Sequence, residues 1–522
     1  MITSISIENF KGIRDRVDLT FKPITLLFGA NSAGKSTVLQ ALHYAGEVLR
    51  NHNLDADRTA TGGDCIRLGG FRQFVHNHEV RRPLVLKIGL QFPHFLSFAD
   101  YYRESENEWD EDSMFLELSP RTAGVELTIR WYAQLGRPFV TAYRLELDGV
   151  HAGTIECNPE RKEVWIRELN DQHPLFLIPG RTEDDADDSA AWRLALSLPI
   201  ALAGARDALP KTGAPLSFGA GALDGPRYRD EAEQRRREAV FSKIFLAPLE
   251  CLVWDLSRFR FVGAMRALPP FGWQDSEGNE ANWADGSAAW RHLVSCDETF
   301  LDTINGWLAA RDKLDTGYRV RRRKVALIDQ ASPLWLDLTS GRAFDETEDL
   351  AHHLKGLPTA TGIVLVDEKR GGLEVAPHDV GIGVSQLVPM LVACLDRVAG
   401  TDLARTVAID TPELHLHPRQ VAALGDLFID AGLGENKHGV ILETHSEHLI
   451  LRLQRRIREH AKGLASTSPP ITGNDVAVYH VAQQDGQTMV NRIDLDQNGD
   501  FVQPWPDDFF EIDFYERFGH AD

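Results

Sequence analysis

The segment 29–37 reads GANSAGKST and matches the pattern G-x-x-x-x-G-K-[ST] at Gly29, Gly34, Lys35 and Ser36. Glycines let the backbone curl so that consecutive N–H groups point at phosphate oxygens, and a following helix adds the positive end of its dipole. In this pattern the lysine reaches the β- and γ-phosphates, and the Ser36 hydroxyl binds Mg²⁺. The segment therefore predicts a P-loop (Walker A) for ATP and Mg²⁺. The residues expected around the phosphates are Gly29, Asn31, Ser32, Ala33, Gly34, Lys35, Ser36 and Thr37.

The flanks of this segment have the periodicity that the motif needs. Residues 24–28 form a β-branched and aromatic run, and residues 37–49 carry apolar side chains at helical spacing. The order strand, loop and helix is the context of a P-loop. A glycine-rich turn that contains GKS by chance is the alternative, and the flanking pattern argues against it.

Composition limits the classes of protein. With 522 residues, two or three domains are expected, or one domain with a large insertion. The formal charge of −21 argues against a chain that coats nucleic acid, so such contacts would be local or made through a partner.

The cysteines are scattered without a C-x-x-C pair, which indicates neither a disulfide framework nor a zinc ribbon. The N-terminus lacks a basic and apolar signal, and the longest apolar stretch, 195–205, contains Pro199 and is too short for a span. We expect a cytoplasmic protein without membrane segments.

The chain divides by pattern into a nucleotide-binding domain with a long insertion. Strands are expected at 3–8 and 17–21, an antiparallel meander over about 83–169, and helices over about 228–245 and 287–310. After about residue 360, short apolar strands typical of parallel sheets alternate with helices. These strands are 363–366, 406–409 and 439–443, and the helices are 385–395, 419–431 and 447–459. The predicted parts are 1–80 and 361–465 for the nucleotide-binding domain, 81–360 for the insertion, and 466–522 for a C-terminal β and tail extension.

A second acidic element should complete the ATP site. The apolar strand 407–409 leads into Asp410, which suits a carboxylate that holds Mg²⁺ (Walker B).

Five motifs together resemble a known family. DVGIGVSQLVP (379–389), DTPELHLHP (410–418) and ETHSEH (443–448) follow the P-loop in order, with looser similarity in FVGAMRALPPF (261–271) and WPDDFF (505–510). The chain is similar to ABC-type AAA-family ATPases related to the overcoming-lysogenization-defect (OLD) proteins and, more remotely, to the Smc, Rad50 and RecF families. The resemblance implies an α/β P-loop ATPase head with a split nucleotide-binding domain and an inserted antiparallel-β and helical region.

The resemblance also implies a head-to-head dimer that encloses two ATP molecules. Gly383, Ser385 and Gln386 would form the ABC signature, whose helix N-terminus meets the γ-phosphate of the opposing nucleotide. His445 would be the switch histidine that senses the γ-phosphate. Gln73 is a candidate for the Gln-loop residue that touches Mg²⁺ or water, and a surface glutamine is the equally plausible alternative.

One position departs from the family pattern. The residue after the magnesium carboxylate is commonly a glutamate that polarises water, and here it is Thr411, which cannot act as a general base near neutral pH. Either Glu413 or another group assists, or hydrolysis is slow and ATP serves mainly as a dimerisation switch.

Members of this family often carry a Toprim nuclease, and the segment after the His445 helix is too short for that fold. The resemblance therefore implies a sensor or scaffold subunit of an antiviral defence system with a separate effector, such as an HNH or Toprim nuclease. A DNA-repair or chromosome-maintenance head that binds DNA directly is one alternative. A scaffold that binds ATP without significant hydrolysis is another.

Overall fold

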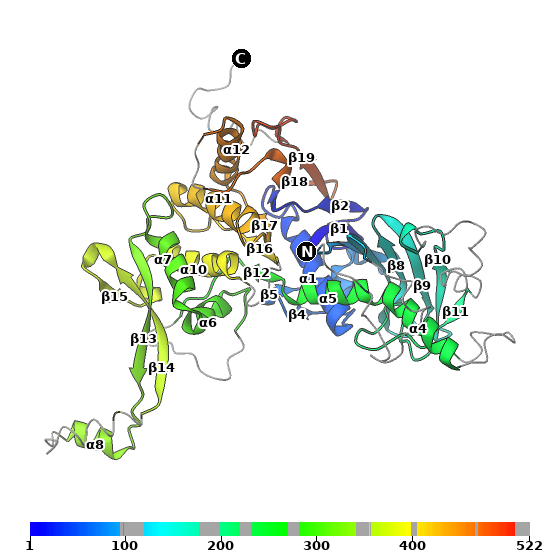
Figure 1. Ribbon diagram of the computed structural model, residues 1–522, viewed down its shortest axis with the longest axis horizontal. Helices are drawn as coiled ribbons and strands as arrows, with labels where there is room; N and C mark the ends of the chain where they lie inside the picture. Colours follow the sequence, from blue (N-terminus) through cyan, green and yellow to red (C-terminus); the bar gives the residue numbers. More distant parts are fainter. Residues whose placement is uncertain are drawn as a thin grey trace.

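The computed structural model describes residues 1–93, 98, 119–176, 198–219, 231–269, 281–340, 354, 357–397, 404–464 and 468–506. The molecule is elongated, with an antiparallel sheet at one end, a mostly parallel sheet in the middle, and a helical lobe with a projecting β-hairpin at the other end (Figure 1). Of the quoted motifs, residues 270–271 and 507–510 lie outside the described residues.

The central sheet contains the P-loop strand. Its strand order is β12 (Arg260–Val262), β16 (Thr406–Asp410), β17 (Gly439–Glu443), β3 (Ile24–Phe28), β18 (Val476–Gln484) and β19 (Gln487–Ile493). Every pair of adjacent strands in this order is parallel except the last pair, in which β19 runs antiparallel to β18. The fold is thus an α/β fold in which β17 separates the P-loop strand from the Asp410 strand.

Alternate residues of the central strands face two different cores, as expected for a sheet covered on both sides. In β3, Leu27 belongs to the core shared with the antiparallel sheet, whereas Leu26 and Phe28 belong to the core under the helical lobe. Because both faces of the sheet are buried, the sequences of these strands are continuously apolar.

The second sheet has eight strands, and all neighbours are antiparallel. Its order is β11 (Ile200–Ala201), β10 (Glu163–Leu169), β9 (Val150–Asn158), β8 (Arg137–Leu147), β7 (Thr122–Tyr132), β6 (Leu84–Gln91), β1 (Ile2–Glu8) and β2 (Val17–Thr20). The predicted meander is therefore confirmed. The first two strands of the chain extend the meander and tie it to the nucleotide-binding part.

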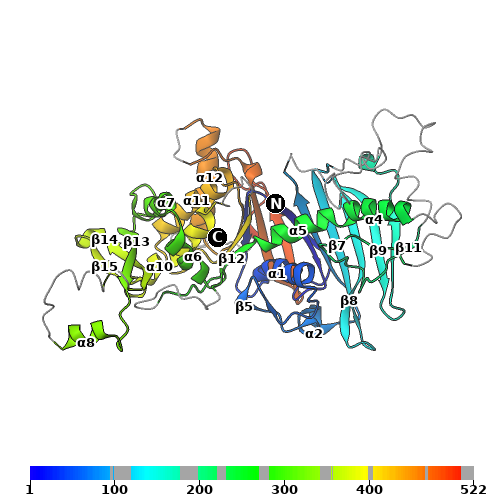
Figure 2. The ribbon, with the colours of Figure 1, turned by 60° about the horizontal axis from the view of Figure 1, so that its bottom comes forward.

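Helices fill the space between and beside the sheets. Helix α1 (Lys35–Asn51) is almost entirely buried and contacts α5 (Ala247–Ser257), which continues from α4 (Glu231–Phe245) along the antiparallel sheet (Figure 2). Near α1 lie the short α2 (Phe71–Phe74) and the hairpin of β4 (Arg58–Thr59) and β5 (Gly63–Arg67).

The helical lobe covers the other face of the central sheet. It consists of α6 (Ser287–Ser295), α7 (Glu298–Ala309), α10 (Ile382–Leu395), α11 (Pro418–Leu433) and α12 (Glu447–Ala461). From this lobe projects a hairpin of β13 (Tyr318–Ala326) and β14 (Thr359–Asp367), flanked by β15 (Leu373–Val375), with α8 (Pro333–Thr339) near its end (Figure 1). Among the described residues, no helix is both long and apolar enough to cross a membrane.

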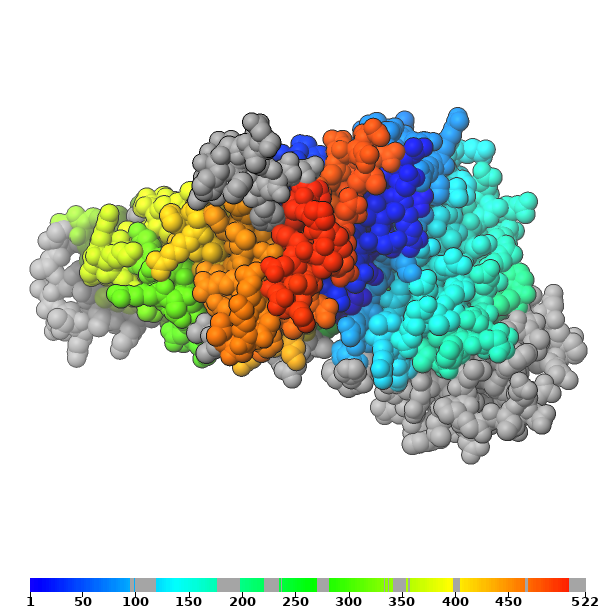
Figure 3. Space-filling view, turned by 90° about the horizontal axis from the view of Figure 1, so that it is seen from above, coloured from blue at the N-terminus to red at the C-terminus, as the bar shows by residue number. Residues whose placement is uncertain are grey.

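One feature of the predicted organisation is wrong. The segment 363–366 lies in β14, which pairs antiparallel with β13 and does not join the parallel sheet. In the C-terminal part of the chain, β18 pairs directly with β3 and places C-terminal residues beside N-terminal ones (Figure 3). The predicted domain limits stay predictions.

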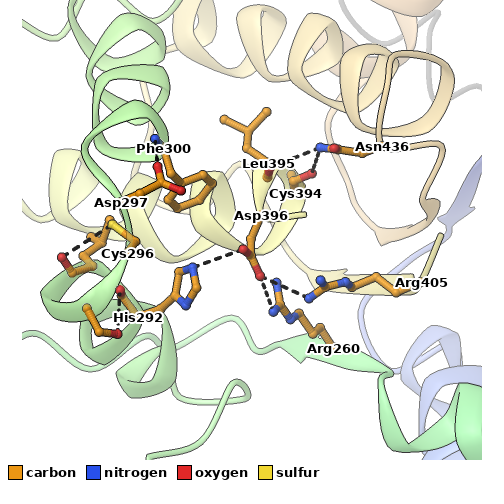
Figure 4. Close-up of polar contacts among 12 residues, drawn as sticks. Arg260, His292, Cys296, Asp297, Phe300, Cys394, Leu395, Asp396, Arg405 and Asn436 are labelled. Carbon is orange, nitrogen blue, oxygen red and sulfur yellow. Dashed lines mark hydrogen bonds and ion pairs between the residues drawn. The ribbon is translucent and has the colours of Figure 1, made fainter. Parts of the chain in front are cut away.

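A buried ionic cluster joins the helical lobe to the start of the central strands (Figure 4). Asp396, directly after α10, forms ion pairs with Arg260 of β12, with Arg405 at 3.3 Å and with His292 of α6 at 3.1 Å. These partners outweigh the burial of the carboxylate and hold the pKa of Asp396 well below its ordinary value. The cluster fixes α10 and α6 relative to the sheet.

Candidate ATP site

The candidate site lies at the carboxyl edge of the central sheet, where three neighbouring parallel strands end. Asp410 is in register with Glu443, and Glu443 is in register with Leu27, close to the start of the P-loop. Because carboxyl ends of parallel strands meet at one edge, residues separated by about 380 positions in the chain become neighbours. Lys35 lies in the electrostatic field of both Glu443 and Asp410.

The P-loop curls around the lysine side chain. Lys35 is 4% exposed, and its ammonium group donates hydrogen bonds to the carbonyl oxygens of Gly29 and Ala30, both at 3.0 Å. Burial lowers the pKa of Lys35, while Glu443, Asp410 and Glu413 oppose this effect. The amine is therefore held at the mouth of the loop, where phosphate oxygens would compete with the two carbonyls.

The C-terminal hairpin braces the P-loop from behind. The Thr488 hydroxyl of β19 donates to the carbonyl oxygen of Ala33 at 3.1 Å. A Cβ atom on Gly34 would lie 2.4 Å from that hydroxyl oxygen, and one on Gly29 would lie 1.9 Å from the carbonyl oxygen of Val481. Gly34 also has a φ of 104°, so glycine is required by both conformation and space.

The serine of the P-loop contacts a carboxylate to which the sequence analysis gave no role. The Ser36 hydroxyl donates to Oε1 of Glu443 at 2.8 Å. Burial, and then the nearby Asp410, raise the pKa of Glu443 to about 7, although Ser36 and Lys35 oppose the shift. The sequence does contain a signal for Glu443, namely a carboxylate at the end of an apolar strand. The same signal identifies Asp410.

The turn after Asp410 has a strained backbone. Thr411 has a φ of 45°, a left-handed conformation that is unusual for a β-branched residue. Its hydroxyl donates to Oδ1 of Asp410 at 2.8 Å, and its N–H donates to the carbonyl oxygen of Glu443 at 2.8 Å. Thr411 therefore orients the Asp410 carboxylate.

Glu413 is held by the loop that carries His445. Its carboxylate accepts hydrogen bonds from the Thr444 hydroxyl at 2.8 Å and from the backbone N–H of His445 at 2.6 Å. Both oxygens are thus engaged, and Glu413 connects the Asp410 turn to the loop after β17.

His445 is half-buried beside the other site residues. Burial and the nearby Lys35 lower its pKa, although Glu413 and Asp410 oppose this shift. A neutral imidazole offers one N–H donor and one acceptor. His445 is therefore suited to contact a phosphate oxygen without carrying a full charge.

Arg266, part of the FVGAMRALPPF motif, is a further residue for which the sequence analysis predicted no role. Arg266 is 4% exposed, and its guanidinium donates to the carbonyl oxygen of Asp410 at 2.9 Å. Its Nε and Nη1 atoms have no hydrogen-bond partner among the described residues. Burial lowers its pKa to about 10. The carbonyl oxygen of Arg266 in turn accepts a hydrogen bond from Nε2 of Gln386 at 2.7 Å.

The predicted signature side chains face inward. Helix α10 begins at Ile382, earlier than predicted, so Ser385 and Gln386 are buried within it. The Ser385 hydroxyl donates to the carbonyl oxygen of Pro377. The prediction that Ser385 and Gln386 open the helix towards an opposing nucleotide therefore needs correction. The exposed start of the helix is formed by Gly381 and Ile382.

Two other predicted residues have local contacts only. A Cβ atom on Gly383 would lie 2.6 Å from the carbonyl oxygen of His415, so glycine permits close packing of α10 on the loop after Asp410. Gln73 lies in α2 with an exposed side chain. No hydrogen bond among the described residues joins it to Ser36 or Asp410, and its role stays a prediction.

The donor set fits Mg²⁺. Hydroxyl and carboxylate oxygens of Ser36, Asp410 and Glu443 are hard ligands that this ion prefers, usually together with substrate phosphates and water. Among the described residues, no three His, Cys, Asp or Glu side chains form a group that could hold a metal alone. The phosphates of a nucleotide would therefore supply the remaining ligands.

Two family models match the chain. Residues 1–68 match a model described as "AAA ATPase domain", and residues 208–452 match one described as "AAA domain, putative AbiEii toxin, Type IV TA system". Both descriptions are of AAA-type ATPase domains, which supports an ATPase of the AAA kind. The two matches together cover the P-loop, Arg266, Asp410 and His445, so they agree with the residues that the fold gathers. No curated protein matches this sequence.

Similar solved structures include heads of Smc proteins. One, an Smc head bound to the C-terminal winged-helix domain of ScpA, is 12% identical, with a TM-score of 0.37 and coverage of 95% of this chain and 98% of that chain. The Smc head domain from Thermotoga maritima is 10% identical, with a TM-score of 0.35 and coverage of 95% and 99%. The Pyrococcus furiosus Smc head with an extended coiled coil, bound to the C-terminal domain of ScpA, is 11% identical, with a TM-score of 0.35 and coverage of 94% and 96%.

Proposed function

We propose that this protein is an ABC-type ATPase that binds ATP with Mg²⁺, hydrolyses it slowly, and acts as the sensor or scaffold subunit of an antiphage defence system. The observation that carries the ATPase part is the position of Lys35, Ser36, Asp410, Glu443 and His445 at one edge of one sheet. These side chains come from three strand ends, and together they supply a phosphate-binding loop, hard oxygen donors and a neutral imidazole.

Each residue has a distinct part in this proposal. Lys35 exchanges the Gly29 and Ala30 carbonyls for phosphate oxygens, and the first N–H groups of α1 add further donors. Ser36 and Asp410 would hold a magnesium ion, which would supply positive charge against the phosphates. His445 contacts the γ-phosphate.

Slow hydrolysis is proposed because the usual base is missing. Thr411 donates its hydroxyl hydrogen to Asp410 and has no basicity near neutral pH. Glu413 has both carboxylate oxygens occupied by Thr444 and His445. Neither residue is available to accept a proton from water without rearrangement of the loop.

The head-to-head dimer is proposed from the exposed start of α10. Gly381 and Ile382 are exposed there, next to the exposed His415 and His417 of the loop after Asp410. The first N–H groups of α10 could meet the γ-phosphate bound by a second copy. ATP would then hold the two copies together.

The role in defence is proposed from the likeness to the OLD-related ATPases. The matching model is described as a putative AbiEii toxin of a type IV TA system, a description that concerns the model and not this chain. In this proposal the ATPase controls a separate effector, such as an HNH or Toprim nuclease, encoded by a neighbouring gene.

A scaffold that binds ATP without turnover is a second candidate, and the contacts of Thr411 and Glu413 favour it. The two candidates separate in one experiment, which compares ATP turnover by the wild type and by Lys35→Ala and measures the mass in solution with and without ATP. Turnover that Lys35→Ala abolishes supports the ATPase. ATP-dependent dimerisation without turnover supports the scaffold. If the protein instead shifts the electrophoretic mobility of DNA at physiological salt, the result would favour a head that binds DNA directly.

A further inference from the structure

Glu443 ends the strand that lies between the P-loop strand and the Asp410 strand. Its Oε1 accepts the Ser36 hydrogen bond, whereas Oε2 is buried and has no hydrogen-bond partner among the described residues. A buried polar atom without a hydrogen-bond partner destabilises the fold, and it does so more strongly when it is charged. Such an atom beside an expected metal ligand points to a cation.

We propose that Glu443 belongs to the magnesium site, where it orients Ser36 towards the ion and adds negative charge beside it. This inference rests on the proposed ATPase function and assigns a positioning role to a residue outside the P-loop, the Asp410 turn and the signature. Glu443 is then a common neighbour of the two expected ligands. It accepts the hydrogen bond of Ser36, and it is in register with Asp410 on the adjacent strand.

The chemistry of the serine hydroxyl supports this role. A hydroxyl has one hydrogen and two lone pairs, so Ser36 can donate to Glu443 and still bind a cation through a lone pair. An acceptor in a fixed position determines where the lone pairs point. Groups that orient metal ligands in this way typically change the metal affinity by about 10- to 100-fold when they are removed.

The charges around the site also favour a divalent cation. The carboxylates of Asp410, Glu413 and Glu443 all interact electrostatically with Lys35, and those of Asp410 and Glu413 also interact with Arg266. Glu413 is stabilised by two donors, but Asp410 and Glu443 repel each other at adjacent strand ends. A magnesium ion held near this pair would reduce the repulsion.

Glu443→Gln tests the proposal because glutamine keeps the shape and the acceptor for Ser36 but removes the charge. The measurement is the binding of a fluorescent ATP analogue during a titration with Mg²⁺, and separately in EDTA. The expected result is that the Mg²⁺ concentration for half-saturation rises about tenfold. Binding in EDTA should be unchanged or tighter, because a negative charge beside the phosphates is lost.

The matched control is Glu447→Gln, which makes the same charge change in the first turn of α12 and should keep the wild-type Mg²⁺ dependence. Glu443→Asp keeps the charge with a shorter side chain and should give an intermediate Mg²⁺ requirement. An unchanged Mg²⁺ dependence in Glu443→Gln would overturn the proposal. Equal weakening with Mg²⁺ and in EDTA would also overturn it, because it would indicate a purely structural role. If the wild type binds no ATP at any Mg²⁺ concentration, the proposed function fails as well.

Discussion

Nε2 of Gln386 donates a hydrogen bond to the carbonyl oxygen of Arg266 at 2.7 Å, and the guanidinium of Arg266 donates to the carbonyl oxygen of Asp410 at 2.9 Å. This short chain of contacts joins α10 to the turn that carries Asp410. We therefore expect a displacement of α10 to reach Asp410 through these contacts. In a head-to-head dimer, such a link would connect the contact with the second copy to the metal site.

Replacement of Arg266 by methionine should weaken this link. The carbonyl oxygen of Asp410 loses its donor, and the cost of an unsatisfied buried group is ~1–3 kcal/mol. We expect a lower melting temperature and at least about a tenfold loss of ATP turnover, because a misplaced carboxylate holds the ion poorly. Arg455→Met, on the exposed face of α12, is the control and should change neither quantity. Wild-type turnover in Arg266→Met would contradict the link.

The position of Thr411 predicts a gain of activity. Glutamate at this position would restore the carboxylate that related ATPases commonly use to polarise water, and general bases contribute ~10²–10⁴-fold to rates. The left-handed backbone should tolerate glutamate at least as well as the β-branched threonine. We expect Thr411→Glu to raise kcat for ATP at least about tenfold, while Thr411→Gln should not. Equal rates in the two variants would show that the missing base does not limit turnover.

The local structure of the candidate ATP site could be predicted from the sequence. The P-loop is one contiguous segment, and the strand before it and the helix after it have clear periodicity, so its conformation follows from nearby residues. Asp410 was identifiable because it follows an apolar strand. The helices α11 and α12 and the strands β16 and β17 were also predicted to within a few residues.

Contacts between distant segments could not be predicted. Nothing in residues 476–493 indicates that β18 pairs with β3, because pairing depends on topology and not on local pattern. The same holds for Arg266 and Glu443, whose partners lie far away in the chain. The inward direction of Ser385 and Gln386 was missed because the start of α10 was placed three residues late.

The brace between the hairpin and the P-loop should matter for nucleotide affinity. Thr488→Val keeps the volume of the side chain but removes the hydroxyl that donates to the Ala33 carbonyl. The loss of one such hydrogen bond costs ~1 kcal/mol, which corresponds to about a fivefold weaker Kd for ATP if the loop conformation depends on it. Calorimetric titration with ATP measures this change. Thr472→Val, in the exposed turn before β18, serves as the control.

Two buried neutral histidines should make stability depend on pH. Burial lowers the pKa of His43 to about 3 and that of His438 to about 4, whereas an unfolded histidine titrates near 6.5. Below pH 6.5 the unfolded state therefore binds more protons, and the free energy of unfolding falls as the pH drops from 6.5 towards 4. Denaturation by urea at pH 7, 6 and 5 measures the slope.

His43→Leu should reduce that slope, because leucine cannot take up a proton in the unfolded state. His460→Leu, near the end of the exposed face of α12, is the control and should keep the wild-type slope. The assignment would be wrong if His43→Leu retained the full dependence on pH.

The most direct test of the central claim is equilibrium binding of ATP with Mg²⁺ to the wild type and to Lys35→Ala. In this account Lys35 and Asp410 come from distant parts of the chain and belong to one site. Binding is therefore also measured for Asp410→Asn. We predict saturable binding by the wild type, loss of binding by at least about a hundredfold in Lys35→Ala, and a raised Mg²⁺ requirement in Asp410→Asn. Equal ATP binding by the wild type and Lys35→Ala would contradict the account.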